Sequence, residues 1–310
     1  MVMAKHIRGR LIAGKRSAFD GAGTTALGIY AMVAVLLATG CAGEGGGASG
    51  AGDWLAYVPG DARMVAILDN QPLRSGDVPE DYAEYFDEEF GGSGEIYDFL
   101  GVSENDLIAH AVALVGDLGG RLTILRGSFD FDIIRGELEG GRGCGDSEYR
   151  GFELWECAGQ DYAAVALFEK ERYVVLVDRR QSDLEDILRY KSQAPEKLAN
   201  TDDSDIKRLL DRTDGWWQIA FLEYPCFEFE RCEGLAIALG RNSDSATMPA
   251  SYAVLFNSEH TATAAEGNSE IDELFHEAFF WLFHVALDVS ESKAEGEFVV
   301  GSGTAKFLTP

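Results

Sequence analysis

Hydrophobic and polar positions alternate along much of the chain after residue 60. Runs that are dense in β-branched and apolar residues, each bounded by polar or glycine-containing segments, predict β-strands. In the first half these runs span 63–68, 109–115, 121–126, 149–156, 162–168 and 172–177. The connections 116–120 and 169–171 are short, and short connections favour antiparallel hairpins over βαβ crossovers.

Helical spacing is found between these runs. Proline or serine starts and glycine ends predict helices at 79–90, 131–139, 182–190 and 204–212. In the third of them Leu184, Ile187 and Leu188 recur on one side, which predicts a helix that covers one face of a sheet.

After the hydrophilic segment 191–204 the pattern restarts. Strands are predicted at 216–224, 233–240 and 251–256, a helical region at 259–281, and strands at 285–290 and 297–301. We therefore predict an α+β fold with mainly antiparallel sheets and packing helices. The halves 54–198 and 199–310 have a related order of elements, which suggests an internal duplication, although no residue-level repeat supports it.

The first 40 residues have the pattern of an export signal. Five basic residues stand against the single acid Asp20, and 21–40 are uncharged with an apolar centre at 26–37. That apolar centre is shorter than the roughly 20 residues of a membrane-spanning helix, so we predict a cleaved signal peptide over residues 1–40. An uncleaved membrane anchor is the alternative.

Cys41 closes this signal. The segment Leu37-Ala38-Thr39-Gly40-Cys41 resembles the bacterial lipobox, although Ala38 stands where that motif usually has leucine. The resemblance implies a lipid-modified Cys41 that joins the mature protein to membrane lipid on the extracytoplasmic side. Residues 42–53 are rich in Gly, Ala and Ser, so 41–53 are expected to form the lipidated end and a flexible tether.

The four other cysteines form an even set. In an oxidising compartment they are expected to form disulfides. Cys144 with Cys157 and Cys226 with Cys232 are the local pairings, and the four allow three connectivities. A zinc site is the alternative, but these cysteines have no C-x-x-C spacing and no nearby histidine, so we expect no metal or cofactor.

Charge limits the choice of partners. The chain carries 26 basic and 53 acidic residues, a formal charge of −27, and removing residues 1–40 would leave 21 against 52, or −31. Nucleic acid and anionic lipid surfaces would repel such a body. The acidic runs lack the order of residues found in calcium-binding loops.

Three segments resemble those of an uncharacterised bacterial lipoprotein family. Residues 54–62, Trp-Leu-Ala-Tyr-Val-Pro-Gly-Asp-Ala, match its L-x-Y-x-P-x-D-A opening, and 126–130 with 149–155 look like later segments of the same group. The resemblance covers about half of the body. It implies a shared fold and no known activity.

Motifs for catalysis are scarce. The sequence has no G-x-S-x-G elbow, Walker loop or G-x-G-x-x-G. Ser204 and Ser290 begin S-x-x-K strings without the companion motifs, and His276 begins an incomplete H-E-x-x-H because residue 280 is phenylalanine. Asp130, Asp132 and Glu137 are the acids that a hydrolase hypothesis would use.

Aromatic density is highest near residue 280. All-round apolarity predicts a buried helix, and the alternative is a pocket wall for an apolar ligand. The candidate residues for such a wall are Phe275, Phe279, Phe280, Trp281 and Phe283. At Trp216-Trp217, strand alternation predicts one buried and one exposed ring.

These patterns favour a non-enzymatic envelope lipoprotein that binds a protein partner or a small ligand. A carrier or chaperone for apolar envelope molecules and an envelope hydrolase are the alternatives.

Overall fold

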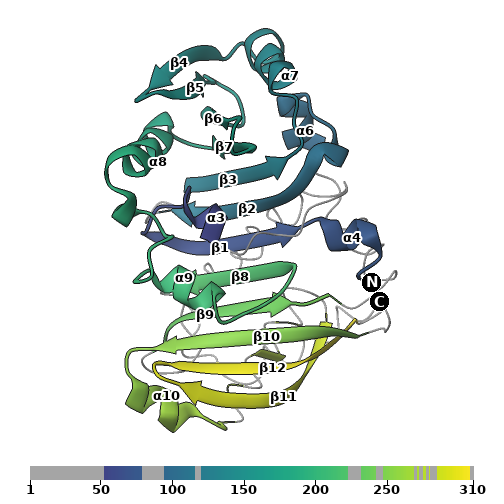
Figure 1. The fold of residues 1–310 in the computed structure, drawn as a ribbon, viewed down its shortest axis with the longest axis vertical. Coiled ribbons are helices and arrows are strands. Elements are labelled where there is room, and N and C mark those ends of the chain that lie inside the picture. Colours follow the sequence, from purple (N-terminus) through teal and green to yellow (C-terminus); the bar gives the residue numbers. More distant parts are fainter. Residues whose placement is uncertain are drawn as a thin grey trace, which may run out of the picture.

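The computed structural model describes residues 52–78, 94–115, 120–222, 232–241, 247–268, 271, 275–276, 279 and 285–307. Its main feature is one 12-stranded sheet in which every recorded strand pair is antiparallel, in the order β11-β12-β10-β9-β8-β1-β2-β3-β7-β6-β5-β4. Several helices pack on it (Figure 1). The α+β class with a mainly antiparallel sheet is therefore confirmed.

Most observed elements match predicted ones, but the strand 145–149 and the helices 52–55, 71–75 and 94–100 were not predicted. The strands are β1 (Ala62–Asp69), β2 (Leu107–Val115), β3 (Gly120–Gly127), β4 (Gly145–Tyr149), β5 (Phe152–Glu156), β6 (Ala164–Phe168), β7 (Tyr173–Val177), β8 (Trp217–Leu222), β9 (Cys232–Leu239), β10 (Thr247–Phe256), β11 (Val285–Glu295) and β12 (Phe298–Phe307). The helices are α3 (Gly52–Leu55), α4 (Gln71–Ser75), α6 (Gly94–Leu100), α7 (Phe131–Gly136), α8 (Gln181–Gln193), α9 (Asp205–Leu210) and α10 (Glu259–Ala265), and short helical turns are η1 (Glu104–Asp106), η2 (Glu137–Gly141) and η3 (Pro195–Lys197).

The two parts of the sheet meet at β1 and β8. These strands pair antiparallel, with Val65 opposite Ala220 and Leu68 opposite Trp217. Outward from this junction the order is β1-β2-β3-β7-β6 in one direction and β8-β9-β10-β12-β11 in the other. In both directions a three-stranded meander is followed in sequence by a helix and then by a hairpin whose last strand pairs with the third strand of the meander. The first part adds the hairpin β4–β5 at its outer edge.

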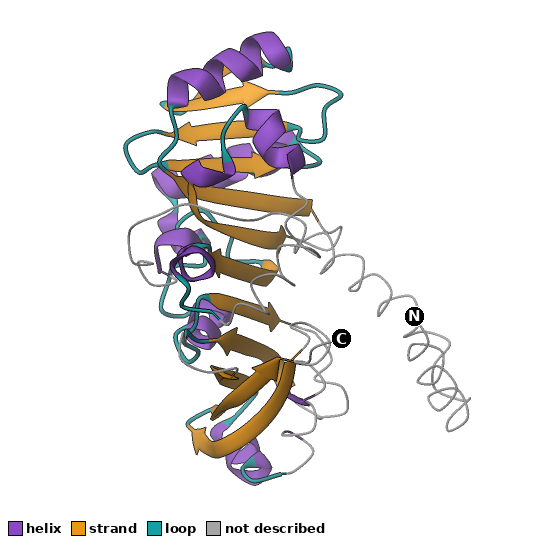
Figure 2. Cartoon of the chain, turned by 90° about the vertical axis from the view of Figure 1, so that its right-hand side faces the viewer, coloured by secondary structure: helices purple, strands orange, loops and turns teal. Residues whose placement is uncertain are grey.

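Alternation along the strands creates two buried faces. On β1, Val65 and Ile67 pack with the helices α3, α8 and α9, whereas Met64 and Leu68 face the other way. That second face is covered by α6 and α7 over the first part of the sheet and by α10 over the second part. Figure 2 shows the strands stacked in one column with helices packed along it.

Two predicted elements are interrupted. The run 149–156 is split by a hairpin turn at Arg150 and Gly151, both with positive φ, 55° and 84°. A two-residue turn of this kind matches the twist of the strands. The expected helix 259–281 is also not continuous, because α10 ends at Ala265 and Gly267 adopts φ 70°. The expected helix 79–90 lies outside the described residues.

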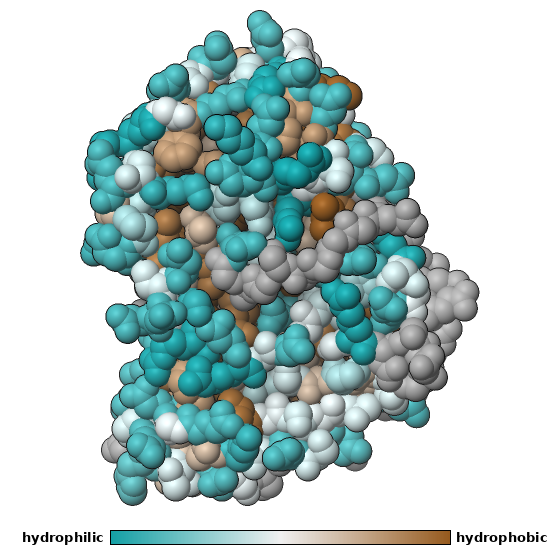
Figure 3. Space-filling view, viewed as in Figure 1, coloured by the Kyte–Doolittle hydropathy of each residue, from teal (hydrophilic) through white to brown (hydrophobic). Residues whose placement is uncertain are grey.

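The surface is mainly hydrophilic, in keeping with the charge. On the face that carries α3, α8 and α9, hydrophobic atoms are limited to small separate patches (Figure 3). Among the described residues Ile133 is the only large hydrophobic side chain classed as exposed, with 54% of its surface accessible. Function must therefore be sought in specific clusters of side chains.

Candidate functional site

Cysteine pairing is the best-resolved part of the predicted site. Cys144, just before β4, and Cys157, just after β5, form a disulfide, as the sequence predicts. The bridge closes the β4–β5 hairpin at the edge of the sheet. Cys232 is also disulfide-bonded, and both Cys226 and the predicted lipid attachment site Cys41 lie outside the described residues.

The aromatic segment near residue 280 contributes to the core. Phe275 and Phe279 are fully buried, and the ring of Phe275 stacks on Tyr252 with centroids 3.9 Å apart and planes 15° apart. The other proposed pocket residues, Phe280, Trp281 and Phe283, lie outside the described residues. The two described rings are thus packed against protein side chains.

Both tryptophans at the start of β8 are buried, which corrects the expectation of an exposed ring. Trp216 and Trp217 are 1% and 2% exposed, with centroids 5.9 Å apart. Trp216 precedes the strand, so strict alternation does not apply to it. Its carbonyl accepts a hydrogen bond from Asp69 N, and its amide donates to Leu239 O.

The three acids considered for a hydrolase all have structural contacts. Asp130 caps α7 by accepting a hydrogen bond from the amide of Asp132 at 3.0 Å, and Glu137 lies 3.5 Å from Arg142. Asp132 pairs with Arg135 at 2.9 Å. These contacts describe helix capping and surface ion pairing rather than an acid–base pair poised over a substrate.

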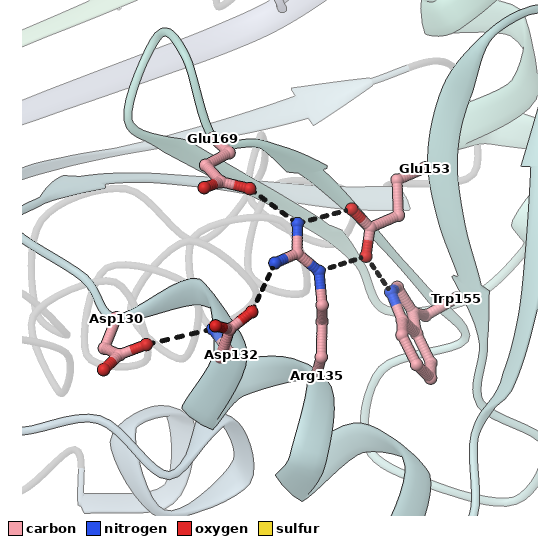
Figure 4. A network of polar contacts seen from close by, with 6 residues as sticks. All are labelled: Asp130, Asp132, Arg135, Glu153, Trp155 and Glu169. Atoms are coloured by element: carbon pink, nitrogen blue, oxygen red, sulfur yellow. Dashed lines mark hydrogen bonds and ion pairs between the residues drawn. The ribbon is translucent and has the colours of Figure 1, made fainter.

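Arg135 is the centre of a larger charged network (Figure 4). Its guanidinium donates two hydrogen bonds of 2.9 Å to Glu153 and one of 2.7 Å to Glu169, besides the contact with Asp132. The indole of Trp155 also donates to Glu153, at 3.0 Å. Arg135 thereby holds the pKa of Glu153 below its usual range. Because the network joins α7 to β5 and to the turn after β6, it stabilises the first part of the sheet.

The serine and histidine candidates occupy structural positions. Ser204 stands at the N-cap position of α9, as the sequence predicts for a helix start, although its side chain makes no capping hydrogen bond to the described helix. Ser290 donates to Ser302 O at 3.1 Å, and Nδ1 of His276 lies 3.0 Å from Leu287 O. Among the described residues no three or more His, Cys, Asp or Glu side chains are grouped to hold a metal ion.

A buried polar corner lies at the end of β1. Asp69 is 2% exposed and pairs with Arg241 at 2.5 Å. Burial raises the pKa of Asp69, although Arg241 and the amide of Gln71 oppose that shift. The next residue, Asn70, is fully buried, and within the described part of the chain neither atom of its side-chain amide has a hydrogen-bond partner. The buried polar groups make this corner energetically costly, and the ion pair links the end of β1 to the segment that follows β9.

A second aromatic cluster lies on the opposite face, around Lys191 of α8. Its ammonium nitrogen is 4.0 Å from the centroid of Tyr57 and 5.5 Å from that of Phe168. Tyr57 in turn packs on Phe168 at 4.8 Å and on Tyr173 at 4.9 Å, and Trp54 meets Tyr173 edge-on at 5.4 Å. A cation over aromatic faces at these distances is a cation–π contact.

Electrostatics distinguishes this cluster from an ordinary core. Burial lowers the pKa of Lys191, and the neighbouring carboxylate of Glu171 opposes the shift. Burial raises the pKa of Tyr57, helped by Glu171 and Asp53. The cluster thus combines aromatic faces, a cation and nearby carboxylates.

Sequence reasoning missed the Lys191 cluster because its members are far apart in the chain. Trp54 and Tyr57 belong to the opening segment, Phe168 and Tyr173 to the hairpin β6–β7, and Lys191 to the end of α8. Only the strand pairing of Phe168 with Tyr173 could have been expected from the short turn between them. No local motif signals that a lysine covers these rings.

The helices within the described part of the chain include none that is both long and apolar enough to cross a membrane.

Comparisons with known proteins give little further guidance. No protein-family model matches the chain, and no curated protein matches it. Six solved chains match by structure. Crystal forms I, III and IV of TP0453 have TM-scores of 0.41, 0.40 and 0.41 and identities of 11%, 11% and 10%; the matches cover 81%, 81% and 83% of this chain and 92%, 93% and 96% of the matched chain.

Proposed function

We propose that this chain is a lipoprotein of the bacterial cell envelope, joined by lipid on Cys41 to the extracytoplasmic side of the membrane, that acts by binding another molecule. The observation that supports the anchor best is how soon after Cys41 buried residues occur in the sequence. Trp54 and Leu55 are 2% and 0% exposed, only 13 and 14 positions after Cys41 in the sequence. A Gly-rich tether would thus lead directly into the fold.

The opening segment is fixed to the body by backbone contacts. The amide of Ala199 donates to Val58 O and that of Gly60 donates to Lys197 O, both at 2.8 Å. Pro59 and Leu198 form an antiparallel bridge. Because residues 58–60 are fixed to residues 197–199, a lipid anchor at Cys41 would keep the whole body close to the membrane surface.

The disulfide supports an extracytoplasmic location. Structural disulfides persist in oxidising compartments and are rare in the cytosol of most cells. The bridge Cys144–Cys157 therefore agrees with export through the signal in residues 1–40.

The resemblance to uncharacterised bacterial lipoproteins fits the same proposal. Binding is favoured over hydrolysis because Asp130, Asp132 and Glu137 serve in a helix cap and ion pairs. The aromatic segment gives no support to an apolar carrier through Phe275 and Phe279, which fill the core. We propose a partner protein or a small ligand as the bound molecule.

Fractionation and intact mass test the anchor. The wild-type protein should sediment with membranes and, after detergent extraction, show the mass of a chain that begins at a lipid-modified Cys41. Cys41→Ser should remain an unlipidated precursor, whereas the control Cys144→Ser/Cys157→Ser should keep the lipid. A wild-type mass in which Cys41 is unmodified and still joined to residue 40 would refute the anchor.

The binding role needs its own test. Protein purified from envelope extract should retain a partner or a ligand that is detectable by mass spectrometry. If crosslinking in intact cells and native mass spectrometry both yielded only the free protein, the binding role would lose its basis.

A further inference from the structure

Lys191 is held by aromatic rings, unlike the two lysines of the described residues that form recorded ion pairs. Lys207 pairs with Asp211 at 2.5 Å and Lys293 pairs with Glu295 at 2.8 Å. Within the described residues the ammonium of Lys191 makes neither an ion pair nor a hydrogen bond, and its recorded contacts are the rings of Tyr57 and Phe168. Its cation is thus held mainly by aromatic faces.

The rings below Lys191 are held rigidly. Tyr57 and Phe168 are 2% and 4% exposed. Tyr173 supports Tyr57, and Phe152 packs on Phe168 with centroids 5.6 Å apart. Removing the lysine would leave these rings in place as a preformed surface for a cation.

We propose that Tyr57 and Phe168 form a binding site for organic ammonium groups, which Lys191 fills in the free protein and vacates for a quaternary ammonium ligand. The ligand class is a small quaternary ammonium solute or the same group on a lipid headgroup. This inference rests on the binding role in the proposed function, but it does not depend on the lipid at Cys41.

A quaternary ammonium suits the site better than a primary one. The lysine ammonium is a compact, strongly hydrated charge, whereas a tetraalkylated nitrogen presents methyl groups and loses less hydration when it meets aromatic rings. Quaternary ammonium recognition is a known functional use of aromatic clusters. Burial lowers the pKa of Lys191, which agrees with a position that suits a strongly hydrated primary ammonium poorly.

Charge near the site also favours a cation. The carboxylates of Glu171 and Asp53 act on the cluster from its rim, and the chain as a whole carries a formal charge of −27. Lys191 is attached to α8 by a flexible stem, so it can leave the rings without unfolding the helix. The cluster therefore has the features of a site that exchanges its own cation for another.

Titration with tetramethylammonium chloride tests the exchange. The full-length protein, purified in a non-ionic detergent, is compared with Lys191→Ala, and the methyl proton resonance of tetramethylammonium is followed by NMR. Aromatic ring currents should shift this resonance upfield in a saturable way. Lys191→Ala should bind about tenfold more tightly, equivalent to about 1.4 kcal/mol, because the competing lysine is gone.

Two controls separate the site from general charge effects. Lys197→Ala removes an exposed lysine from the neighbouring turn η3 and should bind like the wild type. Tyr57→Leu added to Lys191→Ala should abolish the shift, with folding checked by circular dichroism. If that variant fails to fold, Phe168→Leu in the same background should weaken binding.

The overturning results are specific. The proposal fails if neither protein shows a saturable shift, if Lys191→Ala binds no more tightly than the wild type, or if folded ring variants bind unchanged. If wild-type Cys41 is lipidated but tetramethylammonium does not bind, the anchor stands and only the ammonium site fails. If tetramethylammonium binds but wild-type Cys41 is found unlipidated, only the anchor fails.

A competition experiment identifies the source of the ammonium group. Vesicles of phosphatidylcholine, with phosphatidylglycerol vesicles as control, are added to the complex. Displacement of tetramethylammonium by the first but not the second would support a lipid headgroup as ligand. Retention of tetramethylammonium with both would support a small solute.

Discussion

Two aromatic clusters on opposite faces of the sheet differ in what covers their rings. On one face of the sheet, Phe275 stacks on Tyr252 at 3.9 Å and both are fully buried. On the other face, Tyr57 and Phe168 are covered by Lys191. The Phe275 cluster is packed ring against ring and belongs to the core. The rings of the Lys191 cluster are covered by a charged, flexible side chain, as expected of a binding site.

The difference shows that aromatic density in a sequence does not indicate a pocket. The densest segment, around residue 280, contributes Phe275 and Phe279 to a large apolar core. The cluster with binding character is assembled from the opening segment 54–57, β6, β7 and α8. What marks a candidate ligand site here is that the rings are covered by a side chain that can move away.

The largest expected effect comes from Phe275→Ala. This change removes a fully buried ring and leaves a cavity beside Tyr252, which should cost about 3–5 kcal/mol of unfolding free energy. Urea unfolding measures the loss. The control Ile133→Ala, at an exposed position, should change stability by less than about 0.5 kcal/mol, and an equally small effect of Phe275→Ala would show that its ring is not core.

The next largest effect is the loss of stability at acid pH, which we expect to arise from His110. Burial lowers the pKa of His110 to about 4, against 6.5 in the unfolded chain. The unfolded state therefore binds a proton first, and stability is lost as the pH falls from about 6.5 to about 4, by about 3 kcal/mol. His110 lies opposite Leu68 and Leu125, on the face that also contains Phe275.

Unfolding of wild type and His110→Gln between pH 7.5 and pH 4 checks this prediction. Between pH 7.5 and pH 4 the difference in unfolding free energy between the two proteins should change by most of the predicted loss of about 3 kcal/mol. Since protonation of carboxylates affects both proteins alike, parallel pH profiles would contradict the assignment to His110.

Arg135→Met should have an intermediate effect. It leaves Glu153 and Glu169 without their shared cation, and we expect a loss of about 1–2 kcal/mol that shrinks at high salt. Urea unfolding at low and high salt measures it. Arg189, with one exposed pair to Asp186 at 2.8 Å, provides the matched control Arg189→Met, expected to lose under about 0.5 kcal/mol. A salt-independent loss at Arg135 would contradict an electrostatic role.

The smallest effect is expected from Lys191→Met. Methionine keeps an apolar stem over Tyr57 and Phe168, and loss of the cation–π attraction is offset by relief of the buried charge. The change in unfolding free energy should stay within about 1 kcal/mol, with little dependence on salt. A loss as large as that of Phe275→Ala would mean that the lysine is an integral structural clamp rather than an exchangeable cover.

Local patterns predicted most strands but not their assembly into a single sheet. The run 172–177 is observed as Tyr173–Val177 and the run 63–68 as Ala62–Asp69, because alternation and turn residues act over short distances. The pairing of β1 with β8 joins residues about 150 positions apart. No local signal specifies such a contact, since it arises from matching apolar faces in the folded chain.

The candidate sites divide in the same way. The pairing of Cys144 with Cys157 was predictable because both flank one hairpin. The burial of both Trp216 and Trp217 was not, because Trp216 lies before the strand in a turn fixed by Asp69 and Leu239. The Lys191 cluster was equally hidden, as its rings become neighbours only through tertiary packing.

Contacts between tetramethylammonium and individual rings test the contrast most directly. In Lys191→Ala, nuclear Overhauser effects from the methyl protons should reach ring protons of Tyr57 and Phe168 and none of Tyr252 or Phe275. Contacts with Tyr252 or Phe275, or no contact with any of the four rings at saturating ligand, would contradict the assignment of one cluster as an ammonium site and the other as core.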